Sequence, residues 1–325
     1  MGVISPESLV TLMANLEDAA HFLRGADKIL ILSHRSPDGD TLGSGFALCR
    51  ALMQLGKKAR VINDDVIPKK YDYLYSDIDF PEFEADYVVA VDVATENLLG
   101  GLQSSYAGKI DLCIDHHLTN TEYAKNLLLR DYPAACEIIY MLINEMGVKI
   151  DKKIADCLYT GISTDTGCFR YASTTAQSYR IAAELIEHGA DNGKINRAMF
   201  ETKTKTYVAL EKIALNNMKM FCNDRVAVIT VTQDMYAKTG SNEQETEALA
   251  PLTRQIEGVE IGITIREKAD KTCKASIRTY ESVNAAALAK NFGGGGHAQA
   301  AACRFDCSVD EALNQIVKKC GEYLK

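Results

Sequence analysis

The chain has 325 residues, 47% of them hydrophobic and 25% charged, which is typical of a globular protein long enough for two domains. No apolar run reaches the roughly 18 residues needed to cross a bilayer and the N-terminus lacks the regions of a secretory signal, so we expect a cytoplasmic protein without a membrane partner. The formal net charge of −8 argues against duplex DNA as a partner, because binding to the phosphates of a duplex needs a basic face.

In the first part of the chain, short apolar runs alternate with amphipathic stretches. A helix is expected first, over residues 6–23, with Ser5 as its N-cap and Pro6 in its first turn. Further strands and helices then alternate, with strands at 28–33, 58–63, 86–92 and 110–114, and helices at 41–55, 135–146, from 152 onward and at 175–188. This order predicts an α/β fold whose N-terminal domain, residues 1–190, has a mainly parallel sheet with helices on both faces.

A polar stretch at residues 191–207 is interpreted as a linker, after which the pattern restarts. The expected elements are strands at 225–231, 259–267, 272–279 and 300–305, and helices at 243–256, 283–291 and from 309 onward. They predict a smaller α/β C-terminal domain, residues 208–325. We expect a cleft between the two domains, where ligand sites commonly lie.

The strand at 110–114 leads directly into Asp115, His116 and His117. In open α/β sheets, ligands bind outside the carboxyl ends of the strands, so one carboxylate and two imidazoles here point to a chemical role. A polar turn after a core strand is the simpler alternative for this tripeptide alone.

Other strand and helix ends carry side chains of the same kinds. His34, Asp38 and Asp40 follow the strand at 28–33, where Pro37 and Gly39 favour a loop folded around one point over a helix. Asp92 ends the strand at 86–92. The turn at 161–167 presents Asp165.

Four carboxylates converging on one pocket would repel one another unless cations neutralise them. Two divalent ions would do so, and mixed carboxylate and imidazole ligation favours manganese over magnesium, iron or cobalt. Paired ions can hold a hydroxide and stabilise both oxygens of a phosphoryl displacement, which indicates metal-assisted phosphoester hydrolysis. The candidate ligands are His34, Asp38, Asp40, Asp92, His116 and Asp165.

Taken together, H-x-x-x-D-x-D at 34–40, V-D at 91–92, D-H-H at 115–117 and G-I-S-T-D-T-G at 161–167 resemble the four motifs of the DHH phosphoesterase superfamily. The resemblance implies that Asp92 bridges two ions. It places His34 and Asp38 on one ion, and Asp40, His116 and Asp165 on the other. It further implies that Asp115 orients a ligand imidazole and that His117 faces the substrate phosphate.

The C-terminal domain resembles the DHH-associated substrate-binding domain through its glycine run at 293–296 and the histidine that follows. Glycines let backbone amides approach a phosphate or base closely. The family usually has a glycine where this chain has Ala302. The substrate-binding residues implied are Arg278, Gly294, Gly295, Gly296 and His297.

Within the superfamily, the length and architecture resemble the NrnA-like group, which implies hydrolysis of very short RNA (nanoRNA) and of 3′-phosphoadenosine 5′-phosphate (pAp). A phosphodiesterase for cyclic di-AMP or linear dinucleotides such as pApA shares the same plan and is the alternative. A non-catalytic nucleotide-binding protein should lack metal ligands, and all six are present. An exposed edge strand in the first domain could support a homodimer.

Overall fold

The computed structural model describes residues 11–13, 15–280 and 282–324. It divides into two compact units, one extending to Thr202 and the other beginning at Lys203, and each is described by itself. In these described residues, no helix is both long and apolar enough to cross a membrane.

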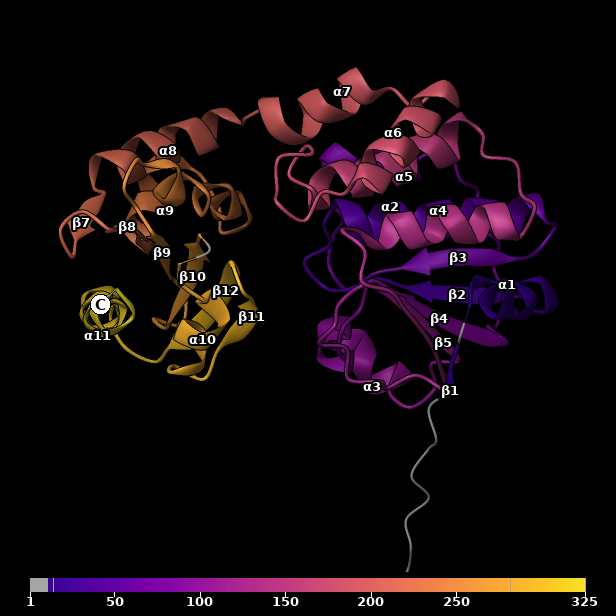
Figure 1. The fold of residues 1–325 in the computed structure, drawn as a ribbon, viewed down its shortest axis with the longest axis horizontal. Helices are drawn as coiled ribbons and strands as arrows, with labels where there is room; N and C mark the ends of the chain where they lie inside the picture. The colour runs from indigo at the N-terminus through magenta and orange to yellow at the C-terminus, as the bar shows by residue number, and fades with distance from the viewer. Residues whose placement is uncertain (1–10, 14, 281, 325) are drawn as a thin grey trace, which may run out of the picture. The chain divides into compact units, whose positions relative to one another are not determined.

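The first unit is built on a sheet in which every pair of neighbouring strands is parallel (Figure 1). This confirms the predicted α/β architecture and puts the carboxyl ends of the strands on one edge. In sheet order the strands are β1 (Thr11–Leu12), β6 (Asn126–Leu129), β5 (Leu112–Asp115), β4 (Tyr87–Val91), β2 (Ile29–Leu32) and β3 (Ala59–Ile62).

Helices cover both faces of this sheet (Figure 1). Strand β2 shows why, since Ile29 and Ile31 pack into one apolar cluster while Leu30 and Leu32 pack into another. A strand buried on both faces has to be apolar throughout. The first cluster takes up α1 (Leu16–Gly25), α2 (Gly39–Gln54), α4 (Ala135–Glu145), α5 (Lys152–Asp165) and α6 (Ala176–Glu187), and the second takes up η2 (Glu96–Leu102) and α3 (Gln103–Tyr106).

Two local predictions in this unit were wrong. The first helix begins only at Leu16, because Asn15 caps it by accepting a hydrogen bond from the backbone of Asp18, and β1 occupies part of the predicted range. Residues 6–10 of that predicted helix lie outside the described residues. Helix α5 runs through most of the predicted turn at 161–167 and ends at Asp165. Strand β6 had not been foreseen from the sequence.

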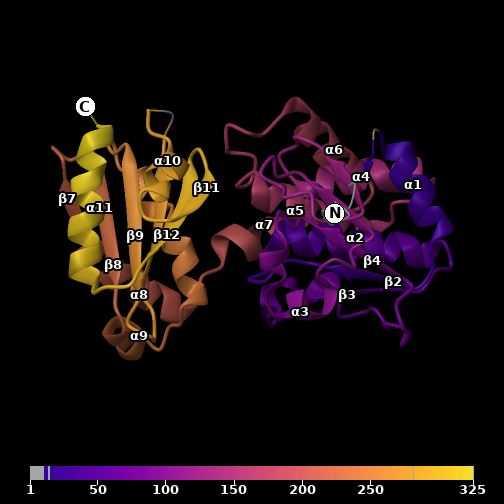
Figure 2. The same ribbon diagram turned by 90° about the horizontal axis from the view of Figure 1, so that it is seen from below.

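The second unit is a mixed sheet in which β8 and β9 are parallel and the other neighbours are antiparallel. Its faces are covered by α8 (Lys205–Asn216) and α9 (Gln233–Thr239) on one side and by α10 (Ala285–Lys290) and α11 (Val309–Tyr323) on the other (Figure 2). In sheet order the strands are β11 (Gly295–His297), β12 (Ala300–Phe305), β10 (Cys273–Thr279), β9 (Ile261–Glu267), β8 (Val226–Val231) and β7 (Lys219–Phe221).

Two segments, residues 191–207 and 243–256, form several short helices in the structure. The stretch interpreted as a linker contains α7 (Asn192–Asn196), the π-helical η3 (Arg197–Glu201) and the first turn of α8. The helix predicted over 243–256 is wrong. Two 3₁₀ helices, η4 (Gln244–Leu249) and η5 (Leu252–Gln255), replace it on either side of Pro251, because proline lacks the amide hydrogen that a continuous helix needs.

Candidate metal centre

The loop after β2 aims His34 at two carboxylates. Its Nδ1–H donates to the carbonyl of Arg35 (2.8 Å), and its own carbonyl accepts from the Asn63 side chain (2.6 Å). These bonds fix the ring so that Nε2 lies 3.6 Å from Asp38 Oδ1 and 3.6 Å from Asp92 Oδ2. A backbone hydrogen bond on one ring nitrogen with the other facing acidic oxygens is the usual arrangement of a metal-bound histidine.

Asp38 is also the N-cap that begins α2. Its Oδ1 accepts from the backbone amides of Asp40 (3.0 Å) and Thr41 (3.1 Å), so the helix opens at this point. The Thr41 hydroxyl donates to the carbonyl of Val91 and accepts from the amide of His34 (both 3.3 Å). The start of α2 is therefore tied to the ends of both β2 and β4.

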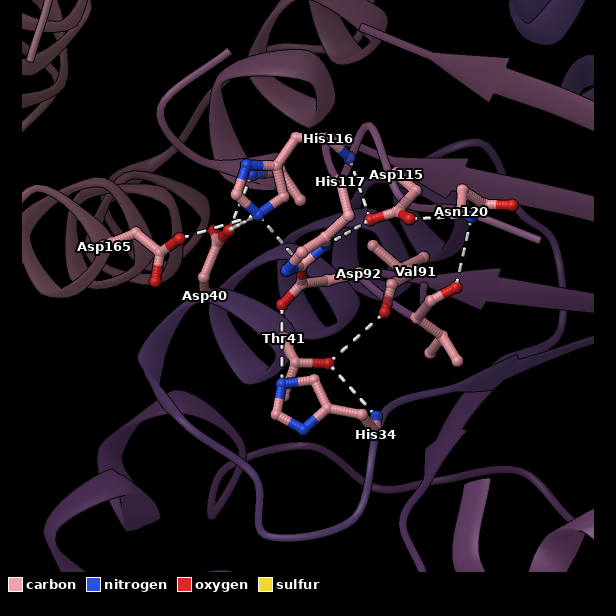
Figure 3. A network of polar contacts seen from close by, with 12 residues as sticks. His34, Asp40, Thr41, Val91, Asp92, Asp115, His116, His117, Asn120 and Asp165 are labelled. Carbon is pink, nitrogen blue, oxygen red and sulfur yellow. Dashed lines mark hydrogen bonds and ion pairs between the residues drawn. The ribbon is translucent and has the colours of Figure 1, made fainter. Parts of the chain in front are cut away.

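Asp92 lies at the middle of the cluster, directly after β4 (Figure 3). It is 3% exposed, and its two oxygens face different histidines, with Oδ2 toward His34 and Oδ1 at 3.3 Å from His116 Nε2. Its backbone φ of 59° is one that residues other than glycine rarely adopt. Such backbone strain is held in place by surrounding structure and gathers at functional sites.

The D-H-H stretch at the end of β5 is held by a separate set of hydrogen bonds (Figure 3). Asp115 is fully buried, and its Oδ1 accepts from His117 Nδ1 and from the amide of His116 (both 2.8 Å), while Oδ2 accepts from the Asn120 side chain (2.7 Å). The Nδ1–H of His116 donates instead to the carbonyl of Tyr132 (2.9 Å). The imidazole that Asp115 orients is thus that of His117, and the Tyr132 carbonyl orients His116.

The N-terminus of α4 holds the carboxylate of Asp40. The amides of Ala135 (2.6 Å) and Cys136 (2.9 Å) each donate to one of its oxygens, as expected where unpaired helix amides meet an anion. Helix α5 crosses close behind, where a Cβ on Gly161 would stand 2.2 Å from Cys136 Sγ and 2.6 Å from Asp40 Oδ1. Glycine at 161 is therefore required for Asp40 to occupy its place.

Asp165, the last residue of α5, completes the cluster on the side of His116. Its Oδ2 lies 3.6 Å from His116 Nε2, and Asp40 Oδ2 lies 3.9 Å from the same nitrogen. Strand ends and helix ends of the first unit thus bring together all six side chains expected to be metal ligands.

Charge crowding governs protonation in this cluster. Burial and the neighbouring Asp92 raise the pKa of Asp40 to about 7. Burial would lower the pKa of His116, but the Asp92 carboxylate that faces its Nε2 at 3.3 Å and the other surrounding carboxylates outweigh this and raise that pKa to about 11. Burial would likewise raise the pKa of Asp92, yet the two histidines hold it well below its ordinary value. Protons here partly neutralise a strongly anionic site.

The donor set fits divalent cations. Ligand atoms within 4.8 Å of one another form three groups that share members: His34, Asp38 and Asp92; Asp40, His116 and Asp165; and Asp92, His116 and His117. Asp92 Oδ1 and His116 Nε2 are buried without a hydrogen-bond partner among the described residues. Buried polar atoms are nearly always satisfied, so this facing pair points to an ion that both would bind.

Sequence reasoning missed the residues that hold the cluster from behind. Asn63, Thr41 and Asn120 carry no motif, and each acts through a partner distant in sequence or through a loop. The available signal was weak, because Thr41 and Asn120 are polar residues close to motifs and Asn63 is a polar residue at the end of an expected strand, and such residues are common there.

The implied substrate-binding residues lie at one end of the second sheet. Arg278 on β10 and His297 on β11 both pair with Ala300 of β12, one from each side, so the three residues form a row across the sheet. Directly opposed residues share a face, and two strand spacings separate the outer pair by about 10 Å. The small Ala300 lies between the two larger side chains.

The glycine run has a structural reason as well. A Cβ on Gly294 would stand 2.2 Å from the carbonyl of Ala302, and one on Gly296, whose φ is 143°, would stand 2.5 Å from that of Ala300. Gly295 has open space on its Cβ side and pairs with Ala302, so the position that departs from the family pattern faces the glycine with room to spare.

A parallel α/β sheet with histidines and aspartates gathered at its carboxyl edge forms a cluster that could hold metal ions, as metal-dependent hydrolases do. Comparison with known families matches residues 28–162 to the DHH family, N-terminal domain, and residues 223–325 to the DHHA1 domain. The chain belongs to the DHH family of phosphoesterases.

Similar proteins agree with this assignment. The bifunctional oligoribonuclease and PAP phosphatase NrnA of Thermus thermophilus is 30% identical over 91% of this chain and 90% of its own length. NrnA of Bacillus subtilis is 27% identical over 91% and 96%. Among solved structures, an exopolyphosphatase-related protein from Bacteroides fragilis superposes with a TM-score of 0.87 at 27% identity, covering 100% of this chain and 99% of that one.

Proposed function

We propose that this protein hydrolyses very short RNA and pAp with the help of two divalent metal ions, manganese being the ion that its ligands favour. The match to the relatives named as oligoribonuclease and PAP phosphatase covers nearly the whole length of those proteins, which supports these substrates. Ligation by imidazole nitrogen and carboxylate oxygen, with no thiolate in the three groups of described residues, supports the choice of metal.

The observation that carries the proposal is the position of Asp92. Its two oxygens face His34 and His116, so one carboxylate belongs to two groups of ligands at once. We propose that His34, Asp38 and Asp92 hold one ion and that Asp40, Asp92, His116 and Asp165 hold the other. When bound, the ions would neutralise the carboxylates and supply a water molecule activated at neutral pH.

His117 is proposed to contact the substrate phosphate. Its Nδ1 is anchored on Asp115, which Asn120 anchors in turn, so the ring has a fixed orientation. Burial would lower the pKa of His117, but the hydrogen bond to Asp115 and the charge of Asp92 outweigh burial and raise it. A ring held in this orientation can present a hydrogen bond to an anionic group.

The row formed by Arg278, Ala300 and His297 is proposed to bind the nucleotide part of the substrate. A guanidinium suits a forked contact with phosphate oxygens, and the small alanine leaves space beside it. The open side of Gly295 would let a base or sugar approach the backbone. That residues of both units hold one substrate stays a prediction.

The test is a side-by-side assay of pAp, a 5′-phosphorylated RNA dinucleotide, a five-residue RNA and cyclic di-AMP. Each substrate is assayed with manganese, with magnesium and with a chelator. We expect manganese to support fast turnover of pAp and short RNA and slow turnover of the cyclic substrate. Preference for cyclic di-AMP would overturn the proposed substrates and move the protein to cyclic-dinucleotide hydrolysis. Turnover that persists in chelator would overturn the role of the metal.

A further inference from the structure

The 3₁₀ helix η1 (Lys69–Leu74) and the turn after it lie along α5 in the opposite direction. Lys153 Nζ is 3.4 Å from Asp77, Cys157 Sγ donates to the carbonyl of Leu74 at 3.8 Å, and the hydroxyls of Thr160 and Tyr73 are 2.7 Å apart. Lys153, Cys157 and Thr160 are three or four residues apart and therefore lie on successive turns of α5. The next turn of α5 reaches Thr164 and Asp165, so the start of η1 runs toward the metal centre.

Tyr71 follows from this register. Tyr71 and Leu74 are three residues apart, which places them on one face of a 3₁₀ helix, and both are buried, at 3% and 0% exposure. The Tyr71 hydroxyl has no hydrogen bond within the described residues. Burial raises the pKa of Tyr71, and the charges of Asp38 and Asp165, one from each ligand group, raise it further, so the hydroxyl stays protonated.

Lys70 brings a positive charge to the same place. Its ammonium lies 4.8 Å from the centre of the Tyr71 ring and forms no ion pair within the described residues. Lys70 is solvent-exposed as a residue, but partial desolvation lowers the pKa of its ammonium, and the charge of Asp38 opposes that effect. The Lys70 ammonium lies over the face of the Tyr71 ring, and within the described residues neither it nor the phenol hydroxyl has an ion pair or hydrogen bond. Both groups belong to the start of η1, which runs toward the metal centre.

We propose that Lys70 and Tyr71 bind a phosphate group of the substrate at the metal centre. Two divalent ions would only balance Asp38, Asp40, Asp92 and Asp165, so the negative charge of an incoming phosphate needs a further cation. Lysine supplies a point charge for this purpose, and the hydroxyl supplies a directed hydrogen bond. This inference rests on the proposed phosphoesterase function and adds two substrate contacts to it.

The experiment compares four variants of the full chain, Tyr71→Phe, Lys70→Met, Tyr73→Phe and Lys69→Met. The last two are matched controls, because the Tyr73 hydroxyl is already bound to Thr160 and Lys69 precedes Lys70 on the same helix. Calorimetry measures the binding of inorganic phosphate to manganese-loaded protein, and a separate titration measures manganese binding. Hydrolysis of bis(p-nitrophenyl) phosphate and of the RNA dinucleotide follows turnover.

Tyr71→Phe and Lys70→Met should each weaken phosphate binding about tenfold, the usual effect of losing a hydrogen bond to a charged group. Manganese affinity and both controls should change less than about twofold on the same scale. Equal effects in all four variants, a parallel loss of manganese affinity, or a wild type that binds no phosphate would each overturn the inference. A wild type that binds phosphate but cleaves no nucleotide would overturn the proposed substrates alone.

Discussion

The two units carry their candidate functional residues in opposite ways. In the first unit Asp40, Asp92 and Asp115 are buried, and each is bonded or closely faced by groups from other elements. In the second unit the residues Gly295–His297 of β11 are exposed and form the edge of a sheet. A buried and anchored cluster suits chemistry that needs fixed geometry, whereas an exposed edge suits the recognition of variable ligands.

The difference also shows in what each glycine does. Gly161 of the first unit lies against Asp40, so its lack of a side chain serves the cluster directly. Gly294 and Gly296 of the second unit lie against the backbone of β12, so they serve the sheet first. Among the described glycines of the second unit, Gly295 alone combines exposure with open space on its Cβ side and a partner strand beside it. We therefore expect ligand contact in the second unit to depend on fewer positions.

The largest effect is expected for Asp92→Ala. Because both groups of ligands share this carboxylate, we expect activity to fall about a thousandfold or more, while circular dichroism shows an unchanged fold. Manganese titration should show loss of tight binding. Hydrolysis retained by this variant in a metal-free preparation would contradict the assignment of the centre.

Much of this centre could be predicted because its residues occur at the ends of apolar strands. The sequence periodicity located β2, β4 and β5, and parallel strands bring such ends together, so His34, Asp92 and His116 were placed correctly as neighbours. The groups behind them could not be predicted. The amides of α4 reach Asp40 across 95 residues, and no local pattern encodes such a contact.

The prediction of local structure failed where one residue or one tertiary contact decides between alternative structures. Asn15 starts α1 late because its side chain caps the helix, and Pro251 splits the helix that had been expected over 243–256. Strand β6 is only four residues long and is defined by its pairing with β5. Such elements depend on partners elsewhere in the chain more than on their own periodicity.

The next effect is the pH dependence of stability, which arises from titrating groups of the first unit. Asp40 has a folded pKa of about 7 and His116 one of about 11, both above their ordinary values. A raised folded pKa contributes stability below the unfolded value and loses it as the pH rises through the folded value. The metal-free protein should therefore lose stability between pH 5 and pH 8, by about 1.4 kcal/mol per pH unit for each proton retained.

Thermal unfolding with chelator and with manganese would measure this effect. Because the ion has to displace the protons, the stabilisation by manganese should grow from pH 5 to pH 8. Asp40→Asn should flatten the pH dependence of the metal-free protein, since its amide does not titrate in this range. If the difference in unfolding temperature between the protein in manganese and the protein in chelator stayed constant with pH, the protonation scheme would be contradicted.

A smaller effect should separate glycines of the two units. Gly161→Ala forces a methyl group against Cys136 and Asp40, and we expect it to destabilise the first unit by about 1–3 kcal/mol and weaken manganese binding. Gly321→Ala is the matched control within α11, where nothing lies within 4 Å, and should stabilise its helix by up to about 1 kcal/mol. Urea unfolding measures both, and shifts of the same sign would contradict the packing argument.

The smallest effect tests whether the second unit recognises nucleotides and takes no part in the chemistry. His297→Ala should raise KM for the RNA dinucleotide about tenfold, corresponding to one lost contact with a charged group. The same variant should hydrolyse bis(p-nitrophenyl) phosphate as well as the wild type, because that probe has no nucleotide for the row around Ala300 to bind. If both substrates lost kcat equally, His297 would belong with the buried cluster in function, and the contrast between the two units would fail.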